Sequence, residues 1–154
     1  MNIASPEDVI DLLPIINAAY EVEKFFVEGD RTDEATIRRM MSAGAFLTAT
    51  DESGRLAGCV YVQLRGDRGY FGMLSVDPSS QGRGLGRRLV DAAEDYARTN
   101  GCIAMDIRVV NLRTELLPFY RKLGYVETGA VEPASDARAL QPFYFVRMSK
   151  QLIA

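Results

Sequence analysis

Apolar residues near the start of the chain recur at helical spacing. Val9, Leu12, Leu13, Ile16, Ala19 and Tyr20 form one stripe, which predicts a helix that begins after Ser5. Ser5 has the chemistry of an N-cap, Pro6 suits the first helical position, and Asp8 completes a capping box. Residues 1–4 leave room only for a short first strand. A second helix is expected from Thr32 or Asp33, with Ile37, Met40 and Met41 facing inward and Gly44 at its end.

The middle of the chain changes to strand-like apolar runs separated by turn residues. The runs cover residues 45–50, 56–64 and 70–76, and the turns between them are Asp51-Glu52-Ser53-Gly54-Arg55 and Gly66-Asp67-Arg68-Gly69. Short apolar runs joined by such turns are typical of β-hairpins. We therefore predict an antiparallel meander here.

The second half of the chain predicts a crossover and a closing hairpin. An amphipathic helix follows Gly84, Asn100-Gly101 ends it, and residues 102–110 read as a strand parallel to 70–76. A short helix is expected over 116–123, strands over 125–128 and 143–149, and an irregular polar loop over 129–142. The fold class is α+β with a mixed sheet, in one domain over residues 1–154.

Three alternating glycines lie where the strand 70–76 leads into the long helix. The run is Gln81-Gly82-Arg83-Gly84-Leu85-Gly86-Arg87, and residues 79–90 hold three arginines and no acid. Free N–H groups and the helix dipole make such a turn suitable for a phosphate. The spacing matches neither the dinucleotide fingerprint nor the Walker P-loop. A glycine-rich turn that binds no ligand is the alternative.

Composition excludes several kinds of chemistry. The chain has no histidine, so it cannot build a Ser-His-Asp triad, a Cys-His pair or a histidine metal site. Cys59 and Cys102 lie in apolar runs without metal-site spacing, so we expect two buried thiols and no metal. A net charge of −3 argues against nucleic acid as a partner. No stretch has the pattern of a membrane span or signal peptide, so we expect a cytoplasmic protein without a membrane partner.

Two motifs together resemble the GNAT superfamily of N-acetyltransferases. The first is [Gln/Arg]-x-x-Gly-x-[Gly/Ala] at residues 81–86, preceded by Leu74-Ser75-Val76-Asp77-Pro78. The second begins at Asn111 and continues through Tyr120 to Gly124-Tyr125. The resemblance covers nearly the whole chain. It implies a mixed, mostly antiparallel sheet, flanked by helices, whose central parallel strands splay apart.

The resemblance also implies acetyl-CoA as cosubstrate and assigns residues to it. Asn111 would hydrogen-bond the cofactor arm, although an asparagine in a turn is the simpler interpretation. Tyr120 would protonate the leaving thiolate; the alternative is a core tyrosine, because Leu116 and Leu123 share its helix face. The cofactor-binding residues implied are Leu74, Ser75, Val76, Gln81, Gly82, Arg83, Gly84, Leu85, Gly86, Arg87 and Asn111.

The predicted activity is transfer of an acetyl group to a primary amine by direct attack in a ternary complex. The acceptor is a small molecule or a peptide, and the terminal strands offer a surface for a homodimer. A catalytically silent acyl-CoA-binding module and a structural protein are the alternatives. Residues 70–76 contain no carboxylate, so the general base stays unassigned. Glu21, Glu23, Glu28 and Asp30 either attract a cationic amine or, the interpretation we favour, form a solvated acidic surface.

Overall fold

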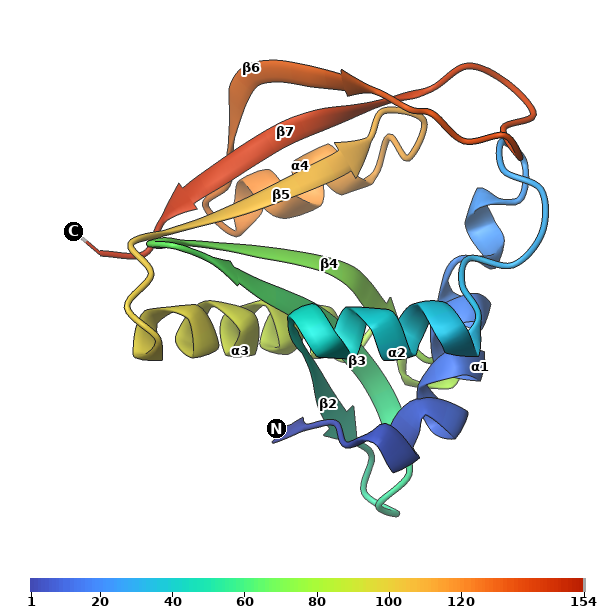
Figure 1. The fold of residues 1–154 in the computed structure, drawn as a ribbon, viewed down its shortest axis with the longest axis vertical. Helices are drawn as coiled ribbons and strands as arrows, with labels where there is room; N and C mark the ends of the chain where they lie inside the picture. The colour runs from blue at the N-terminus through green and yellow to red at the C-terminus, as the bar shows by residue number, and fades with distance from the viewer. Residues whose placement is uncertain (154) are drawn as a thin grey trace.

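The computed structural model describes residues 1–153, in which strands outnumber helices (Figure 1). The α-helices are α1 (Val9–Ala19), α2 (Glu34–Ala43), α3 (Leu85–Thr99) and α4 (Leu116–Lys122). The strands are β1 (Asn2–Ile3), β2 (Ala45–Thr50), β3 (Leu56–Arg65), β4 (Arg68–Val76), β5 (Ala104–Val110), β6 (Val126–Pro133) and β7 (Tyr144–Gln151). Single 3-10 turns occupy Pro6–Asp8, Glu21–Glu23 and Pro78–Ser80.

The strands form one seven-stranded sheet in the order β1-β2-β3-β4-β5-β7-β6. Every neighbouring pair is antiparallel except β4 and β5, which are parallel. Their pairing covers only Arg68–Tyr70 against Ala104–Asp106, after which the two strands diverge (Figure 1). The predicted α+β fold with a splayed central parallel pair is therefore confirmed.

Helices cover both faces of the sheet, and each face has its own core. On one face, α3 and α4 pack over a cluster that includes Leu89, Ala93 and Met105. On the other face, α1 and α2 place Leu12 and Ile37 against the sheet. The alternation of strand side chains between faces explains how one apolar strand supplies both cores. On β3, for example, Val60 and Val62 join the first cluster, whereas Cys59 and Tyr61 join the second.

A β-bulge at Met73 reverses this alternation within β4. The register with β3 shifts between Cys59 and Tyr61, and Met73 has a φ of +55°, which is unusual for a non-glycine residue. Phe71 and Met73 would share a face in a regular strand, but Phe71 packs against α3 and Met73 against α1. Bulges bend the strand that carries them. The bend at Met73 accompanies the divergence of β4 from β5.

The structure departs from the sequence-based expectations in two places. The first helical segment opens with a 3-10 turn and becomes α-helical at Val9, while the predicted capping box between Ser5 and Asp8 is present. The expected loop over 129–142 is wrong at its start, because β6 continues to Pro133. The glycine at 129 and a register shift between Glu127 and Val131 mark an irregular strand, which period-two patterning does not reveal.

Candidate active site

The glycine turn connects the diverging end of β4 to the first turn of α3. Gly84 is the N-cap of α3 and has a φ of +74°, in the left-handed region that glycine adopts without steric cost. A Cβ atom on Gly84 would meet no protein atom within 4 Å. The turn is therefore open on the side where a ligand would approach the helix N-terminus.

The backbone N–H groups of residues 82–86 make no hydrogen bond to another group within residues 1–153. Within residues 1–153, Arg88 is the first residue of α3 whose N–H donates to a carbonyl oxygen, that of Gly84 at 3.2 Å. No side chain caps the helix, and its first turn carries no acid. Arg83 and Arg87 are exposed beside the turn. Free N–H groups, a helix dipole and flanking guanidinium groups fit the pyrophosphate of coenzyme A.

The edge of β4 that faces β5 has no strand partner beyond Tyr70. Leu74, Ser75 and Val76 lie on this stretch, and β3 pairs with the opposite edge. Ser75 is fully buried, and its hydroxyl donates to the carbonyl of Met73 at 2.9 Å. An extended amide chain can pair with such a free strand edge in the manner of an added strand. The pantetheine arm of coenzyme A has amides of this kind.

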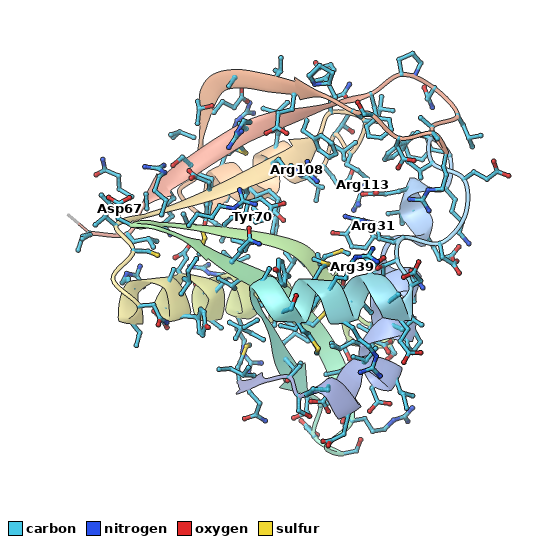
Figure 2. The ribbon with its side chains drawn as sticks, viewed as in Figure 1. Arg31, Arg39, Asp67, Tyr70, Arg108 and Arg113 are labelled. Atoms are coloured by element: carbon cyan, nitrogen blue, oxygen red, sulfur yellow. The ribbon has the colours of Figure 1, made fainter. Side chains whose placement is uncertain are left out.

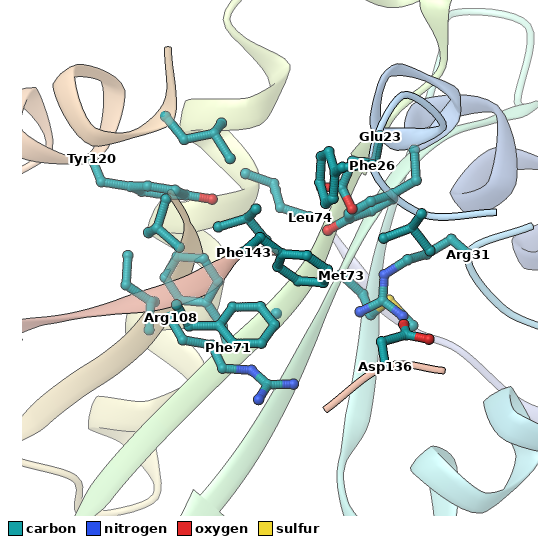
Figure 3. Close-up of a pocket in the computed structure, with 18 of the residues that line it drawn as sticks. Glu23, Phe26, Arg31, Phe71, Met73, Leu74, Arg108, Tyr120, Asp136 and Phe143 are labelled. Carbon is teal, nitrogen blue, oxygen red and sulfur yellow. The ribbon is translucent and has the colours of Figure 1, made fainter. Parts of the chain in front are cut away.

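A cavity of about 200 Å³ lies between the diverging strands (Figure 3). Its lining includes Phe71 and Tyr120 from the α3 side of the sheet, and Tyr20 and Met73 from the α1 side. The cavity therefore passes through the plane of the sheet. Groups that enter from opposite faces can meet inside it.

Tyr120 is a buried core tyrosine that also lines the cavity. Its ring is buried on α4 against Phe71 and Tyr125, with centroid separations of 6.0 Å for each pair. Its hydroxyl points into the cavity (Figure 3) and has no hydrogen-bond partner among residues 1–153. Burial raises the pKa of this phenol, so it is protonated at neutral pH.

Glu23 departs from the interpretation of the acidic cluster as a solvated surface, which the other three members follow. Glu21, Glu28 and Asp30 are exposed, but Glu23 is 8% exposed and lines the cavity. The Arg113 guanidinium donates to Glu23 Oε2 at 2.9 Å. Burial raises the pKa of Glu23 above its ordinary value, although the bond from Arg113 opposes the shift. The sequence did not distinguish Glu23 from its neighbours, because burial depends on β5 and the turn after it.

A second carboxylate, that of Asp136, lies in the cavity wall (Figure 3). It accepts from the backbone N–H of Arg138 at 2.9 Å, and this bond is the main reason why its pKa lies below the ordinary value. Asp136 is therefore a weaker base than Glu23.

Asn111 directly follows β5, and it is hydrogen-bonded to Tyr144 of the neighbouring strand β7. Its Oδ1 accepts from the backbone N–H of Tyr144 at 2.8 Å, and its own N–H donates to the Tyr144 carbonyl at 3.0 Å. Only the side-chain NH₂ group of Asn111 is left to donate to a ligand. Its role toward the cofactor arm stays a prediction.

Two loops join across the open end of the splay. Glu28 N–H donates to the Arg138 carbonyl at 2.9 Å, and Leu140 N–H donates to the Phe26 carbonyl at 2.8 Å. Figure 1 shows the loop after α1 meeting the loop between β6 and β7 at this place. The contact encloses the cavity on its wide side. Residues 114 positions apart in sequence therefore share one wall, and no local pattern predicts such a pairing.

The comparison with known families agrees with this geometry. Residues 11–125 match the model of the acetyltransferase (GNAT) family. The chain therefore belongs to this family of acetyltransferases. Among residues 1–153, no helix is long and apolar enough to span a membrane.

Individual relatives differ in the acceptor that their names give. A mycothiol acetyltransferase of Propionibacterium freudenreichii is 31% identical over 143 residues, which cover 86% of this chain and 46% of the relative. A glucosamine 6-phosphate N-acetyltransferase of Oryza sativa is 32% identical over 95 residues, covering 62% of this chain and 50% of the relative. The chain thus spans about half the length of these two relatives.

A solved structure extends the likeness to the whole fold. The phosphinothricin acetyltransferase of Sinorhizobium meliloti, in complex with acetyl-CoA, superposes with a TM-score of 0.79 at 16% identity. The match covers 99% of this chain and 87% of that one. At this identity the likeness concerns the fold alone.

Proposed function

We propose that this chain is an acetyl-CoA-dependent N-acetyltransferase that acts on a primary amine in a ternary complex. The observation that carries the proposal is the cavity through the sheet, with Tyr120 on one side and Glu23 on the other. A single cavity that both faces reach allows the thioester and the amine to meet directly. Family membership supports acetyl-CoA as the cosubstrate.

The chain's own groups divide the work of binding. Backbone N–H groups of residues 82–86 bind the pyrophosphate, with Arg83 and Arg87 beside it, and Gln81 and Leu85 complete the turn. The free edge of β4 at Leu74, Ser75 and Val76 pairs with the pantetheine amides, and Asn111 donates to the arm. When bound, acetyl-CoA supplies the activated acetyl group.

Two side chains handle protons. Glu23 removes the proton of the acceptor ammonium, because burial has moved its pKa toward neutrality and makes it the stronger of the two cavity bases. A lysine-like amine needs about 4–5 kcal/mol to deprotonate at pH 7, so a base inside the cavity matters. Tyr120, which is protonated at neutral pH, gives its proton to the leaving sulfur.

Thiol release from acetyl-CoA in the presence of an amine panel tests the proposal. Tyr120→Phe should lower kcat by about 100-fold, within the usual range for general-acid catalysis, while acetyl-CoA affinity stays unchanged. Tyr96→Phe on α3 is the control, because it removes the same hydroxyl from a ring that does not line the cavity. Equal kcat in the two variants would remove Tyr120 as the acid.

The same assay separates the proposal from the silent binding module on this fold. A silent module predicts saturable acetyl-CoA binding without thiol release from any amine. Absence of both binding and release would contradict the enzyme and the module together.

A further inference from the structure

A second, wider cavity of about 500 Å³ adjoins the first and is lined by arginines. The two cavities share Arg31, Tyr70, Met73 and Arg108 in their linings. Figure 2 shows Arg31, Arg39 and Arg108 around the same opening, although they come from the loop before α2, from α2 and from β5. The arginines of this lining are Arg31, Arg39, Arg65, Arg108 and Arg147.

The positive charge of this cavity is only partly balanced. Glu132 is the one carboxylate in its lining as the structure describes it, and it binds Arg147 at 2.6 Å and Arg108 at 3.6 Å. Asp136 lies close enough to Arg31 to feel its charge, but it is hydrogen-bonded to Arg138. The surplus is local, because the whole chain carries a net charge of −3.

Within residues 1–153, Arg39 and Arg65 hydrogen-bond only to neutral groups, although Asp33 lies close enough to Arg39 to feel its charge. Arg39 donates to the Thr36 hydroxyl at 3.1 Å, and Arg65 donates to Gln63 Oε1 at 2.7 Å while it lies 4.3 Å from the centroid of Tyr70. These contacts hold the guanidinium groups in place without neutralising them.

Arginines that form no ion pair with a carboxylate are concentrated in a few places on this protein, and this cavity is one of them. Eight of the chain's arginines form ion pairs with carboxylates. Those without such a partner within residues 1–153 are Arg31, Arg39, Arg55, Arg65, Arg83, Arg87 and Arg88. Arg83 and Arg87 lie at the glycine turn, Arg31, Arg39 and Arg65 lie in this cavity, and Arg55 and Arg88 lie elsewhere. The first group faces a proposed phosphate site, which suggests that the second group also serves an anion.

We propose that the acceptor of this enzyme carries a carboxylate or phosphate group as well as its amine. Arg39 and Arg65 bind the anionic group, with Arg31 and Arg108 beside it, while the amine lies in the adjoining cavity near Glu23. A recess lined by one sign of charge concentrates ligands of the opposite sign, and the guanidinium fork matches both oxyanions. This inference rests on the proposed acetyltransferase function, whose acceptor it narrows.

Matched amine pairs test the inference through initial rates of thiol release at saturating acetyl-CoA. One arm compares amino acids with their carboxamides, and the other compares amino-alcohol phosphates with the parent amino alcohols. The anionic member of at least one arm should have the higher kcat/KM, and the preferred arm identifies the carboxylate or the phosphate.

Arginine variants connect the preference to this cavity. Arg39→Gln and Arg65→Gln should each raise KM for the anionic member about tenfold, which corresponds to about 1.4 kcal/mol, and leave the neutral member and acetyl-CoA affinity unchanged. Arg38→Gln is the matched control, because Arg38 neighbours Arg39 on α2 but binds Glu34 at 2.8 Å and does not line the cavity. Equal use of both members, or an unchanged preference in both variants, would overturn the inference and leave the acetyltransferase function standing.

If no amine is acetylated, that result counts against the proposed acetyltransferase function and not against the anion site. A binding measurement then tests the anion site directly. Calorimetric titration of the CoA-saturated protein with the anionic probes should then give saturable binding that Arg39→Gln and Arg65→Gln weaken and Arg38→Gln preserves. No binding of any anionic probe at millimolar concentration would overturn the inference on its own.

Discussion

Gly84→Asp tests the phosphate site with a control that the chain itself supplies. Gly84 has a φ of +74°, and Gly54, in the turn between β2 and β3, has a φ of +84°. A Cβ at either position would meet no protein atom within 4 Å. Gly54→Asp therefore matches Gly84→Asp in backbone strain, in open surroundings and in added charge, but it lies in a different turn.

The two variants should lose similar stability and differ in ligand affinity. Placing a non-glycine residue in the left-handed region costs about 1–2 kcal/mol, which lowers the Tm of a chain of this size by about 3–6 °C. At Gly84 the new carboxylate also faces the pyrophosphate. Repulsion between unit charges 4 Å apart is about 1 kcal/mol in water and about 4 kcal/mol near a protein surface, so acetyl-CoA affinity should fall about fivefold to several-hundredfold.

Calorimetric titration with acetyl-CoA measures the affinity, and thermal unfolding measures the shared strain. Wild type and Gly54→Asp should bind alike, and saturating acetyl-CoA should raise the Tm of both; at 100 times Kd the ligand adds about 2.7 kcal/mol. At the same concentration Gly84→Asp should gain less, from about 1.8 kcal/mol if its affinity falls fivefold to almost nothing if it falls several-hundredfold. If all three proteins bind equally, the backbone of residues 82–86 does not hold the cofactor.

Two further predictions concern acids whose pKa values the fold shifts in opposite directions. Glu23→Gln should lower kcat/KM by about 100-fold and remove the acid limb of its pH profile. That limb lies above the ordinary carboxyl pKa of 4.5, because burial raises the pKa of Glu23. Glu21 is an exposed neighbour, so Glu21→Gln should keep the limb, and loss of the limb in this control would contradict the assignment. Asp106 binds Arg68 through two bonds of 2.7 and 2.8 Å, which lower its pKa, so Asp106→Asn should cost on the order of 1 kcal/mol in urea unfolding at pH 7. Because the folded-state pKa is depressed, the pair's contribution is present above the unfolded pKa and is lost as pH falls through the folded value. The difference from wild type should therefore shrink as the pH is lowered below the ordinary value of 3.8, and a difference that does not shrink would refute this account.

Much of the fold follows from local physics that a sequence displays. The stripe of Val9, Leu12 and Ile16 and the glycine stop at Gly44 predicted the helices, and the turns at 51–55 and 66–69 predicted the meander. The crossover rule predicted that β5 lies parallel to β4. These features can be predicted from the sequence because hydrophobic periodicity and turn chemistry depend on only a few neighbouring residues.

Only part of the candidate site could be predicted from the sequence. The glycine turn and Tyr120 lie in contiguous motifs, so the sequence displayed them. The bulge at Met73 was not predicted, although Gly72 precedes it within the strand, because the residue that adopts φ +55° is a methionine rather than a glycine. The strand end at Pro133 was missed for a related reason, since an irregular strand loses its alternation.

The sequence by itself determined the elements, their order, the glycine turn before α3 and the family resemblance, because each depends on residues close together in the chain. Only the tertiary structure decided that Glu23 is a buried cavity carboxylate and that Arg39, Arg65 and Arg108 share one recess. Burial and local charge are properties of what the fold brings together from distant segments. For the same reason the sequence named no acceptor, whereas the arginine-lined cavity indicates its charge.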